Sequence, residues 1–117
     1  MIVDLHGGAW NTGGLSSCQV RSKVLVKSGF AIAAIDFRQG NERYPSSLQD
    51  INYAVRWLKA NGSEYKINPT RVGISGQSSG GHLAALVAMR PDDERYNQII
   101  LETIGHVDAS VVCMALE

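Results

Sequence analysis

A G-x-S-x-G pentapeptide at Gly76–Gly80 restricts the fold of this 117-residue chain more than any other feature. A short apolar run, residues 71–75, precedes it, and a run with helical character, residues 81–89, follows it. Glycines on both sides of the serine remove the clashes that Cβ atoms would cause in a sharp bend. The sequence therefore predicts a strand, a tight turn and a helix, with Ser78 exposed at the turn.

Apolar runs and helical patterns alternate along the rest of the chain. We expect buried strands at 1–5, 30–35, 71–75 and 109–116, and helices at 17–27, 46–60 and 81–89. Ser46 and Gln49 have the spacing of a capping box at the start of the second helix. Strands that alternate with helices favour the α/β class, here a three-layer parallel sheet of about four strands.

A second glycine-rich motif, His6–Trp10, directly follows the first predicted strand. Glycines in such a loop let backbone N–H groups turn toward an oxygen that becomes negatively charged during a reaction. The N–H of Ser79, at the start of a helix, is a further donor of this kind. Two motifs with related chemistry, in this order, indicate one site for acyl transfer.

Composition excludes several classes of partner. Eleven basic and eleven acidic residues give no net charge, and without a basic run neither nucleic acid nor an anionic membrane is an expected partner. Hydrophobic residues make up 44% of the chain, which indicates a single globular domain over residues 1–117. No signal peptide is visible, so a cytoplasmic location is the default expectation. Cys18 and Cys113 are predicted to be buried free thiols, and no metal-ligand spacing is present.

The two motifs, together with D-F-R at 36–38, the segment 44–58 and N-P-T-R-V-G-I-S-G at 68–76, resemble the α/β-hydrolase fold. Within that fold the chain is similar to the hormone-sensitive-lipase-like, acetyl-esterase and feruloyl-esterase-like carboxylesterases. The resemblance implies hydrolysis of small-molecule carboxylic esters without metal or organic cofactor. It also implies the strand order second, first, third, fourth. Both motif loops then leave the carboxyl ends of neighbouring strands, where the chain reverses direction and ligands bind.

The resemblance also implies a role for each motif residue. Ser78 would be the nucleophile, and the N–H groups of Gly8, Ala9 and Ser79 would form the oxyanion hole. Ala9 stands where many members have a third glycine, a change that keeps the backbone N–H. The supporting residues would be His6 and Gly7 in the first loop and Gly76 and Gly80 in the turn.

A serine nucleophile also needs a histidine base and an acid, which this family places well downstream. After Ser78 the only histidines are His82, in the first turn of a helix, and His106. We expect His106 and Asp108 at the amino end of the sheet, away from Ser78. The sequence is therefore interpreted as an internal segment of an esterase domain. The isolated chain should be weak or inactive, and it should self-associate through the exposed edge of its last strand.

Two alternatives to an esterase remain open at this stage. An amidase resembling arylformamidases shares both motifs, and a non-catalytic α/β module could bind an anion at the helix after Gly76–Gly80. Trp10 and Tyr44 either line a substrate pocket or pack against neighbouring loops. Asp36 and Arg38 are expected to form an ion pair that braces their loop.

Overall fold

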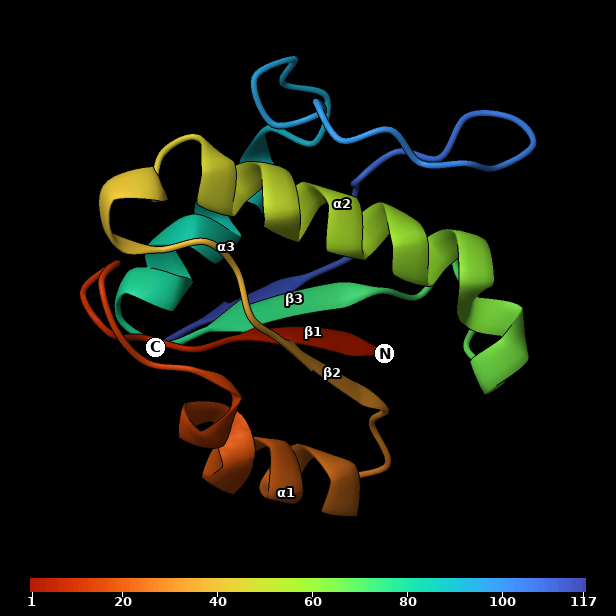
Figure 1. Ribbon diagram of the computed structural model, residues 1–117. Helices are drawn as coiled ribbons and strands as arrows, with labels where there is room; N and C mark the ends of the chain where they lie inside the picture. The colour runs from red at the N-terminus through yellow and green to blue at the C-terminus, as the bar shows by residue number, and fades with distance from the viewer.

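The computed structural model describes all residues, 1–117, as one parallel sheet with helices on both faces. The strands are β1 (Ile2–Leu5), β2 (Ile32–Ile35), β3 (Gly73–Gly76) and β4 (Met114–Leu116), in the order β2-β1-β3-β4. Figure 1 shows α1 (Gln19–Lys27) below the sheet and α2 (Ser46–Asn61) and α3 (Ser79–Met89) above it. The α/β class, the three layers and the strand order are confirmed.

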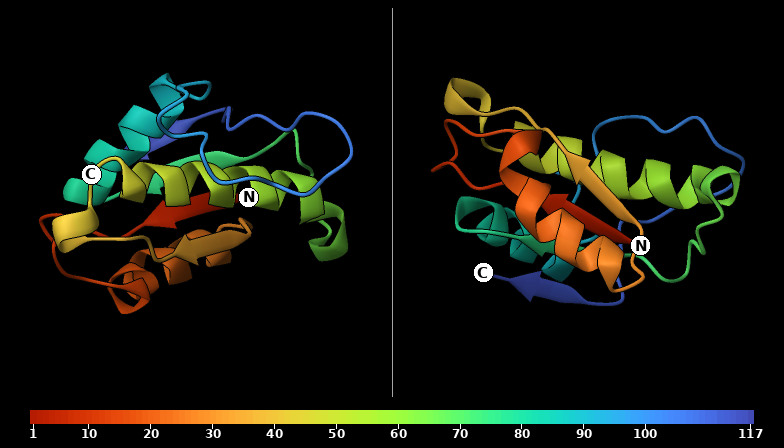
Figure 2. Two further views of the ribbon diagram at one scale, coloured as in Figure 1. Left: turned by 45° about the horizontal axis from the view of Figure 1, so that its top comes forward. Right: turned by 90° about the horizontal axis from the view of Figure 1, so that it is seen from below.

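Short 3-10 turns complete the chain at Leu15–Cys18, Gly40–Glu42 and Gly62–Tyr65. The views in Figure 2 place α1 alone on its face of the sheet, while α2 crosses the opposite face beside α3. None of the helices combines the length and the apolar character that crossing a bilayer requires.

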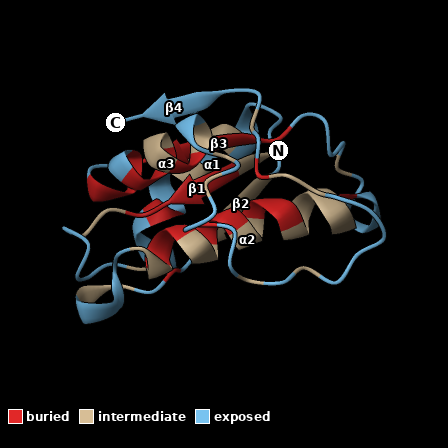
Figure 3. Cartoon of the chain, turned by 90° about the horizontal axis from the view of Figure 1, so that it is seen from above, coloured by how far each residue is buried: buried red, intermediate tan, exposed pale blue.

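The core lies between the sheet and the helix pair α2–α3. Most of its aliphatic side chains come from the two central strands, the residue before β3 and the inner faces of these helices, and Phe37 and Tyr96 add two aromatic rings from loops. The larger aliphatic members are Val3, Leu5, Leu48, Ile51, Val55, Val72, Ile74, Leu83 and Val87. In Figure 3 the inner face of α2 and the central strands are buried, whereas β4 is exposed along its length. The best-packed strands are therefore β1 and β3, which carry the two motif loops.

Three details of the edge strands differ from the sequence prediction. The predicted strand at 30–35 is shorter and only half-buried because β2 lies at an edge, and Phe30 is exposed. The predicted strand at 109–116 pairs only over Met114–Leu116, since Ala109 packs into the core before the chain reaches the sheet. Cys113 is exposed rather than buried, whereas Cys18 is buried, and both thiols are free.

The predicted capping box at the start of α2 is wrong. Pro45 occupies the N-cap, so Ser46 lies inside the helix and makes no side-chain cap. Gln49 instead donates from Nε2 to the carbonyl of Arg95, 3.0 Å away. The helix begins where predicted, but its start is stabilised by packing and by a link to a distant loop.

Candidate active site

Ser78 forms the tight turn between β3 and α3. Its backbone has φ 54° and ψ −123°, a left-handed conformation that is rare for a residue with a Cβ atom. Its N–H donates to the carbonyl of Glu117 at 2.7 Å, and the Gly80 N–H donates to the carbonyl of Gln77 at 2.8 Å. The turn is therefore fixed from both sides, and Ser78 is exposed at the carboxyl end of the sheet.

The glycines of the pentapeptide are required by close backbone approach. A Cβ atom at Gly76 would lie 2.3 Å from the carbonyl oxygen of Gly80. One at Gly80 would lie 2.4 Å from the carbonyl oxygen of His6, because α3 begins directly against the end of β1. Contacts this short do not occur between real Cβ atoms and oxygen. The absence of side chains at these glycines thus allows the backbones of the two motifs to lie in direct contact.

The His6–Trp10 loop passes beside Ser78. A Cβ atom at Gly7 would lie 3.3 Å from Ser78 Cβ. The next three residues all have positive φ: 131° at Gly8, 52° at Ala9 and 62° at Trp10. None of the N–H groups of Gly8, Ala9 and Ser79 donates a hydrogen bond within the protein. Ser79 is buried, Gly8 is half-buried and Ala9 is exposed, so these N–H groups are open to water or to a ligand.

His6 holds the loop in place. Its buried ring stacks on Phe37, with the ring centroids 4.5 Å apart and the planes 7° from parallel. Nδ1–H donates to the Gly7 carbonyl at 2.8 Å, which fixes the ring, and Nε2 lies 3.2 Å from Asp36 Oδ1 without forming a hydrogen bond. Because the ring is enclosed and faces Asp36, His6 is a brace for the loop and not a group directed at Ser78.

Asp36 and Arg38 do not form the predicted ion pair. Arg38 donates from Nε and Nη2 to the carboxylate of Asp50 on α2, with a shortest distance of 2.8 Å. The loop after β2 is therefore tied at one point to the His6 ring and at another to α2.

A buried polar network lies under the two loops, and sequence reasoning missed it. Asp4, in the middle of β1, is fully buried and accepts from Arg21 Nε at 2.9 Å and Nη2 at 2.6 Å. It also accepts from the Ser75 hydroxyl at 2.6 Å and the Ser22 hydroxyl at 3.2 Å. The network links β1, β3 and α1 directly beneath the residues that position Ser78. Asp4 and Ser75, polar residues inside two otherwise apolar strands, were the sequence features that could have indicated this network.

Cys18 lies at the edge of this network. Its Sγ is 3.7 Å from the Asp4 carbonyl oxygen. Burial, reinforced by the charge of Asp4, raises the pKa of the Cys18 thiol to about 11. The thiol therefore stays protonated and unreactive at neutral pH.

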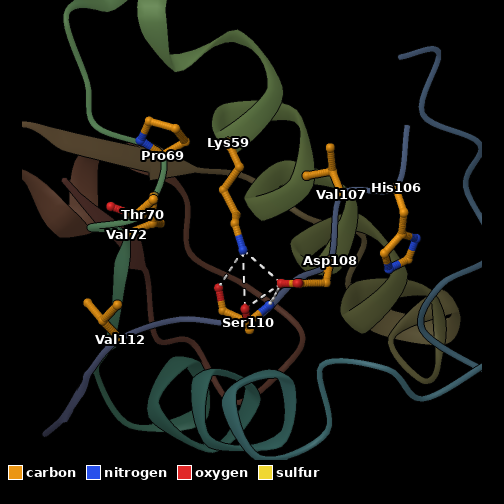
Figure 4. A pocket seen from close by; sticks show the side chains of 9 residues that line it. All are labelled: Lys59, Pro69, Thr70, Val72, His106, Val107, Asp108, Ser110 and Val112. Atoms are coloured by element: carbon orange, nitrogen blue, oxygen red, sulfur yellow. Dashed lines mark hydrogen bonds and ion pairs between the residues drawn. The ribbon is translucent and has the colours of Figure 1, made fainter. Parts of the chain in front are cut away.

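Neither downstream histidine forms a hydrogen bond with the Ser78 hydroxyl. His82 projects from the first turn of α3, and its ring meets the edge of Trp10 at a centroid distance of 5.7 Å. His106 lines a cavity with Thr70 and Val72, which precede β3, and so lies at the amino end of the sheet (Figure 4). In the same cavity Asp108 accepts from Lys59 Nζ at 2.7 Å. The expected location of His106 and Asp108 is confirmed.

A different cavity, of about 560 Å³, opens beside the His6–Trp10 loop. It is lined by residues of that loop, of the start of α2 and of α3: Ala9, Trp10, Asn11, Arg43, Tyr44, Ser47, His82 and Leu83. Trp10 and Tyr44 line this cavity and also pack on other rings, Trp10 on His82 and Tyr44 on Tyr96, with centroids 5.7 and 6.4 Å apart. The binding of a substrate in the cavity stays a prediction. No group of His, Cys, Asp or Glu side chains is gathered so as to hold a metal ion.

A comparison with known families matches residues 1–113 to the model described as BD-FAE. The chain belongs to the BD-FAE family. This BD-FAE chain is 33% identical over 113 residues to the "Probable carboxylic ester hydrolase LipM" of Mycobacterium tuberculosis, which matches 95% of the chain and 26% of LipM. The chain thus spans about a quarter of the length of that relative.

Solved structures of esterases share this fold. Esterase Est2 of Thermogutta terrifontis, with propionate bound, superimposes with a TM-score of 0.82 at 26% identity, over 98% of this chain and 42% of Est2. The same esterase phosphorylated by paraoxon matches equally well. A protein titled "Bifunctional GH43-CE Bacteroides eggerthii" gives a TM-score of 0.85 at 28% identity, over 97% of this chain and 16% of that one. The partial α/β-hydrolase fold of the BD-FAE chain is therefore shown by its neighbours.

Proposed function

We propose that this BD-FAE chain carries the nucleophile and the oxyanion hole of a serine carboxylesterase. The observation that carries the proposal is the left-handed Ser78 between β3 and α3, next to N–H groups of Gly8, Ala9 and Ser79 that have no partner in the protein. A strained residue held among unpaired donors is typical of an active site. The esterase names of the relatives support the same chemistry.

In the proposed reaction, the Ser78 oxygen attacks the carbonyl carbon of an ester, and a general base accepts the hydroxyl proton. The carbonyl oxygen becomes negatively charged and is stabilised by the Gly8, Ala9 and Ser79 N–H groups. The C–O bond to the alcohol then breaks, and the alcohol leaves with a proton from the conjugate acid of the base. Water hydrolyses the resulting acyl-serine by the same two steps, which releases the acid.

The base is proposed to come from outside residues 1–117. His6 is enclosed by Phe37 and Asp36, His82 packs on Trp10, and His106 lies at the opposite end of the sheet. A general base must lie about 2.6–3.2 Å from the hydroxyl oxygen. Without it, Ser78 should react slowly, although the oxyanion hole still contributes.

Labelling with a fluorophosphonate probe tests this function directly. We expect the probe to modify the chain once, at Ser78, as identified by peptide mass spectrometry. Added imidazole should accelerate the labelling, because it supplies the missing base in solution. Ser78→Ala should abolish the modification. The matched control is Ser79→Ala, which removes a neighbouring hydroxyl but keeps its backbone N–H, and which should leave the labelling intact.

Two results would overturn the proposal in different ways. Labelling that is equal in the wild type and in Ser78→Ala would remove Ser78 as the nucleophile. Fast labelling that ignores imidazole and is lost in His82→Ala would identify His82 as the base.

A further inference from the structure

The cavity beside the His6–Trp10 loop contains a cation without an anionic partner. Arg43 precedes α2, and its Nη1 donates to Asn11 Oδ1 at 3.2 Å and to the Gly40 carbonyl at 3.4 Å. Its backbone carbonyl accepts from the Ser47 N–H at 2.9 Å. The two Nη1 bonds orient the guanidinium from one side, whereas Nε and Nη2 of this exposed side chain donate to no group in the protein and face the open cavity.

Three other arginines of the same chain bind a carboxylate with this edge, whereas Arg56 uses it for two neutral oxygens, Asn52 Oδ1 and the Ile99 carbonyl. Arg21, Arg38 and Arg95 each donate from Nε and Nη2 to one carboxylate, that of Asp4, Asp50 and Asp93 respectively. This two-point geometry matches a carboxylate and makes the hydrogen bonds strong. Arg43 presents the same edge with no carboxylate to fill it.

The rest of the cavity suits a flat, anionic group. Trp10 and Tyr44 supply aromatic walls, Leu83 adds an apolar one, and no Asp or Glu side chain lines the space. The volume of about 560 Å³ lies within the range of small-molecule sites. Ala9 links the cavity to the loop beside Ser78, so a bound ester could place its second functional group here.

We propose that Arg43 selects esters that carry a carboxylate, with the carboxylate bound at Nε and Nη2 and an aromatic or short aliphatic part between Trp10 and Tyr44. The identity of the ligand as an ester rests on the proposed function, whereas the carboxylate site rests on Arg43 itself. Arg43 acts as a specificity residue and takes no part in proton transfer.

Benzoate and benzyl alcohol are suitable probes because they share the ring and differ in charge. The chain has two tryptophans, Trp10 and Trp57, so a Trp57→Phe background makes Trp10 the reporter of the cavity. Titration of its fluorescence gives a Kd for each probe. We expect benzoate to bind more tightly than benzyl alcohol. Arg43→Gln should weaken benzoate roughly ten- to a hundredfold and leave benzyl alcohol unchanged.

Arg71→Gln is the matched control. The Arg71 side chain has no hydrogen bond or ion pair, and it lines a cavity at the amino end of the sheet. It should not alter the Kd of either probe. Arg43→Lys, which keeps the charge but loses the two-point edge, should lie between the wild type and Arg43→Gln. Unchanged binding of benzyl alcohol shows that each variant keeps its fold.

The inference is overturned if benzoate does not bind the wild type, or if Arg43→Gln binds benzoate as tightly as the wild type does. It is also overturned if Arg71→Gln weakens benzoate binding as much as Arg43→Gln does. Fluorophosphonate labelling of the same variants separates this inference from the proposed function. Loss of benzoate selectivity in Arg43→Gln, with no labelling of Ser78 in any variant, would support the carboxylate site and reject the esterase. Labelling of Ser78, with benzoate binding unchanged in Arg43→Gln, would support the esterase and reject the carboxylate site.

Discussion

Lys59 at the amino end of the sheet and the N–H groups beside Ser78 at the carboxyl end differ in how far they are paired within the protein. At the amino end, Lys59 donates to Asp108, to the Ser110 carbonyl and to the Ser110 hydroxyl, so its ammonium group is fully used (Figure 4). At the carboxyl end, the N–H groups of Gly8, Ala9 and Ser79 are held beside Ser78 without partners. Paired charges satisfy each other within the fold, whereas unpaired donors are free to bind a ligand, as the proposed function requires.

The largest expected effect concerns the network that supports the carboxyl end. Asp4→Asn leaves Arg21 without its buried partner, and breaking such a pair costs about 3–5 kcal/mol of the free energy of unfolding. Urea denaturation followed by circular dichroism measures the loss. The double variant Asp4→Asn/Arg21→Met should be less destabilised, because no unpaired charge stays buried. A single variant within about 1 kcal/mol of the wild type would contradict a structural role for the pair.

The next prediction tests whether the unpaired donors act on a reaction. Gly8 has φ 131°, and a Cβ atom there would lie 2.0 Å from the Thr12 carbonyl oxygen. Gly8→Val must therefore distort the loop, and loss of one oxyanion donor slows reaction about 100- to 1,000-fold. The rate of fluorophosphonate labelling at Ser78 measures this. Gly105→Val is the control, since Gly105 also has a positive φ but has nothing near its Cβ position. Equal rates in the two variants would exclude the loop from the reaction.

A smaller effect is expected at the amino end. Hydrogen bonds from Lys59 and Ser110 hold the pKa of the Asp108 carboxyl well below its usual value. The folded pKa is lower than the unfolded one, so the pair stabilises the fold above about pH 3.9, and this contribution is lost as the pH falls below that value. Lys59→Met should cost up to about 1 kcal/mol at pH 7, and less at pH 3. Thermal unfolding across this range checks the sign, and labelling of Ser78 should not change.

The smallest effect concerns the two thiols, one beside the Asp4 network and one near the amino end. Iodoacetamide at pH 8 should alkylate exposed Cys113 in the native chain and spare Cys18, whose pKa burial raises to about 11. Both thiols should react in urea. Modification of Cys18 at the same rate as Cys113 under native conditions would mean that the region around Asp4 opens readily. Peptide mapping distinguishes the two sites.

The helices and strands along the chain could be predicted because periodicity and glycine placement are local properties of the sequence, whereas the order of strands in the sheet came from the family resemblance. The turn at Ser78 is the clearest case, since Gly76 and Gly80 specify its geometry within one segment. Partners that depend on distant segments were not predictable. Asp4 lies within an apolar run, and nothing in that run indicates its partner Arg21. The predicted partner of Arg38 was its neighbour Asp36, whereas the observed one is Asp50.

Burial near the sheet edges was the other source of error. Cys113 lies in an apolar run, which predicts burial, but the run enters an edge strand with no neighbour on its outer side. The exposed edge of β4, with Met114 and Leu116 about half exposed, fits the expected self-association, which stays a prediction. Analytical ultracentrifugation over a range of concentrations would test it.

Because the backbone of Ser78 is left-handed, stable folding and the proposed chemistry favour different residues at position 78. Such a conformation costs on the order of 1–3 kcal/mol in a residue with a side chain, and glycine relieves it. In a library randomised at position 78 and sorted only for folded protein, glycine should displace serine within a few rounds. Sorting the same library by capture on a fluorophosphonate should return serine. Under the proposed function, a serine in the position where glycine folds best would therefore be maintained against mutational drift by what its hydroxyl does.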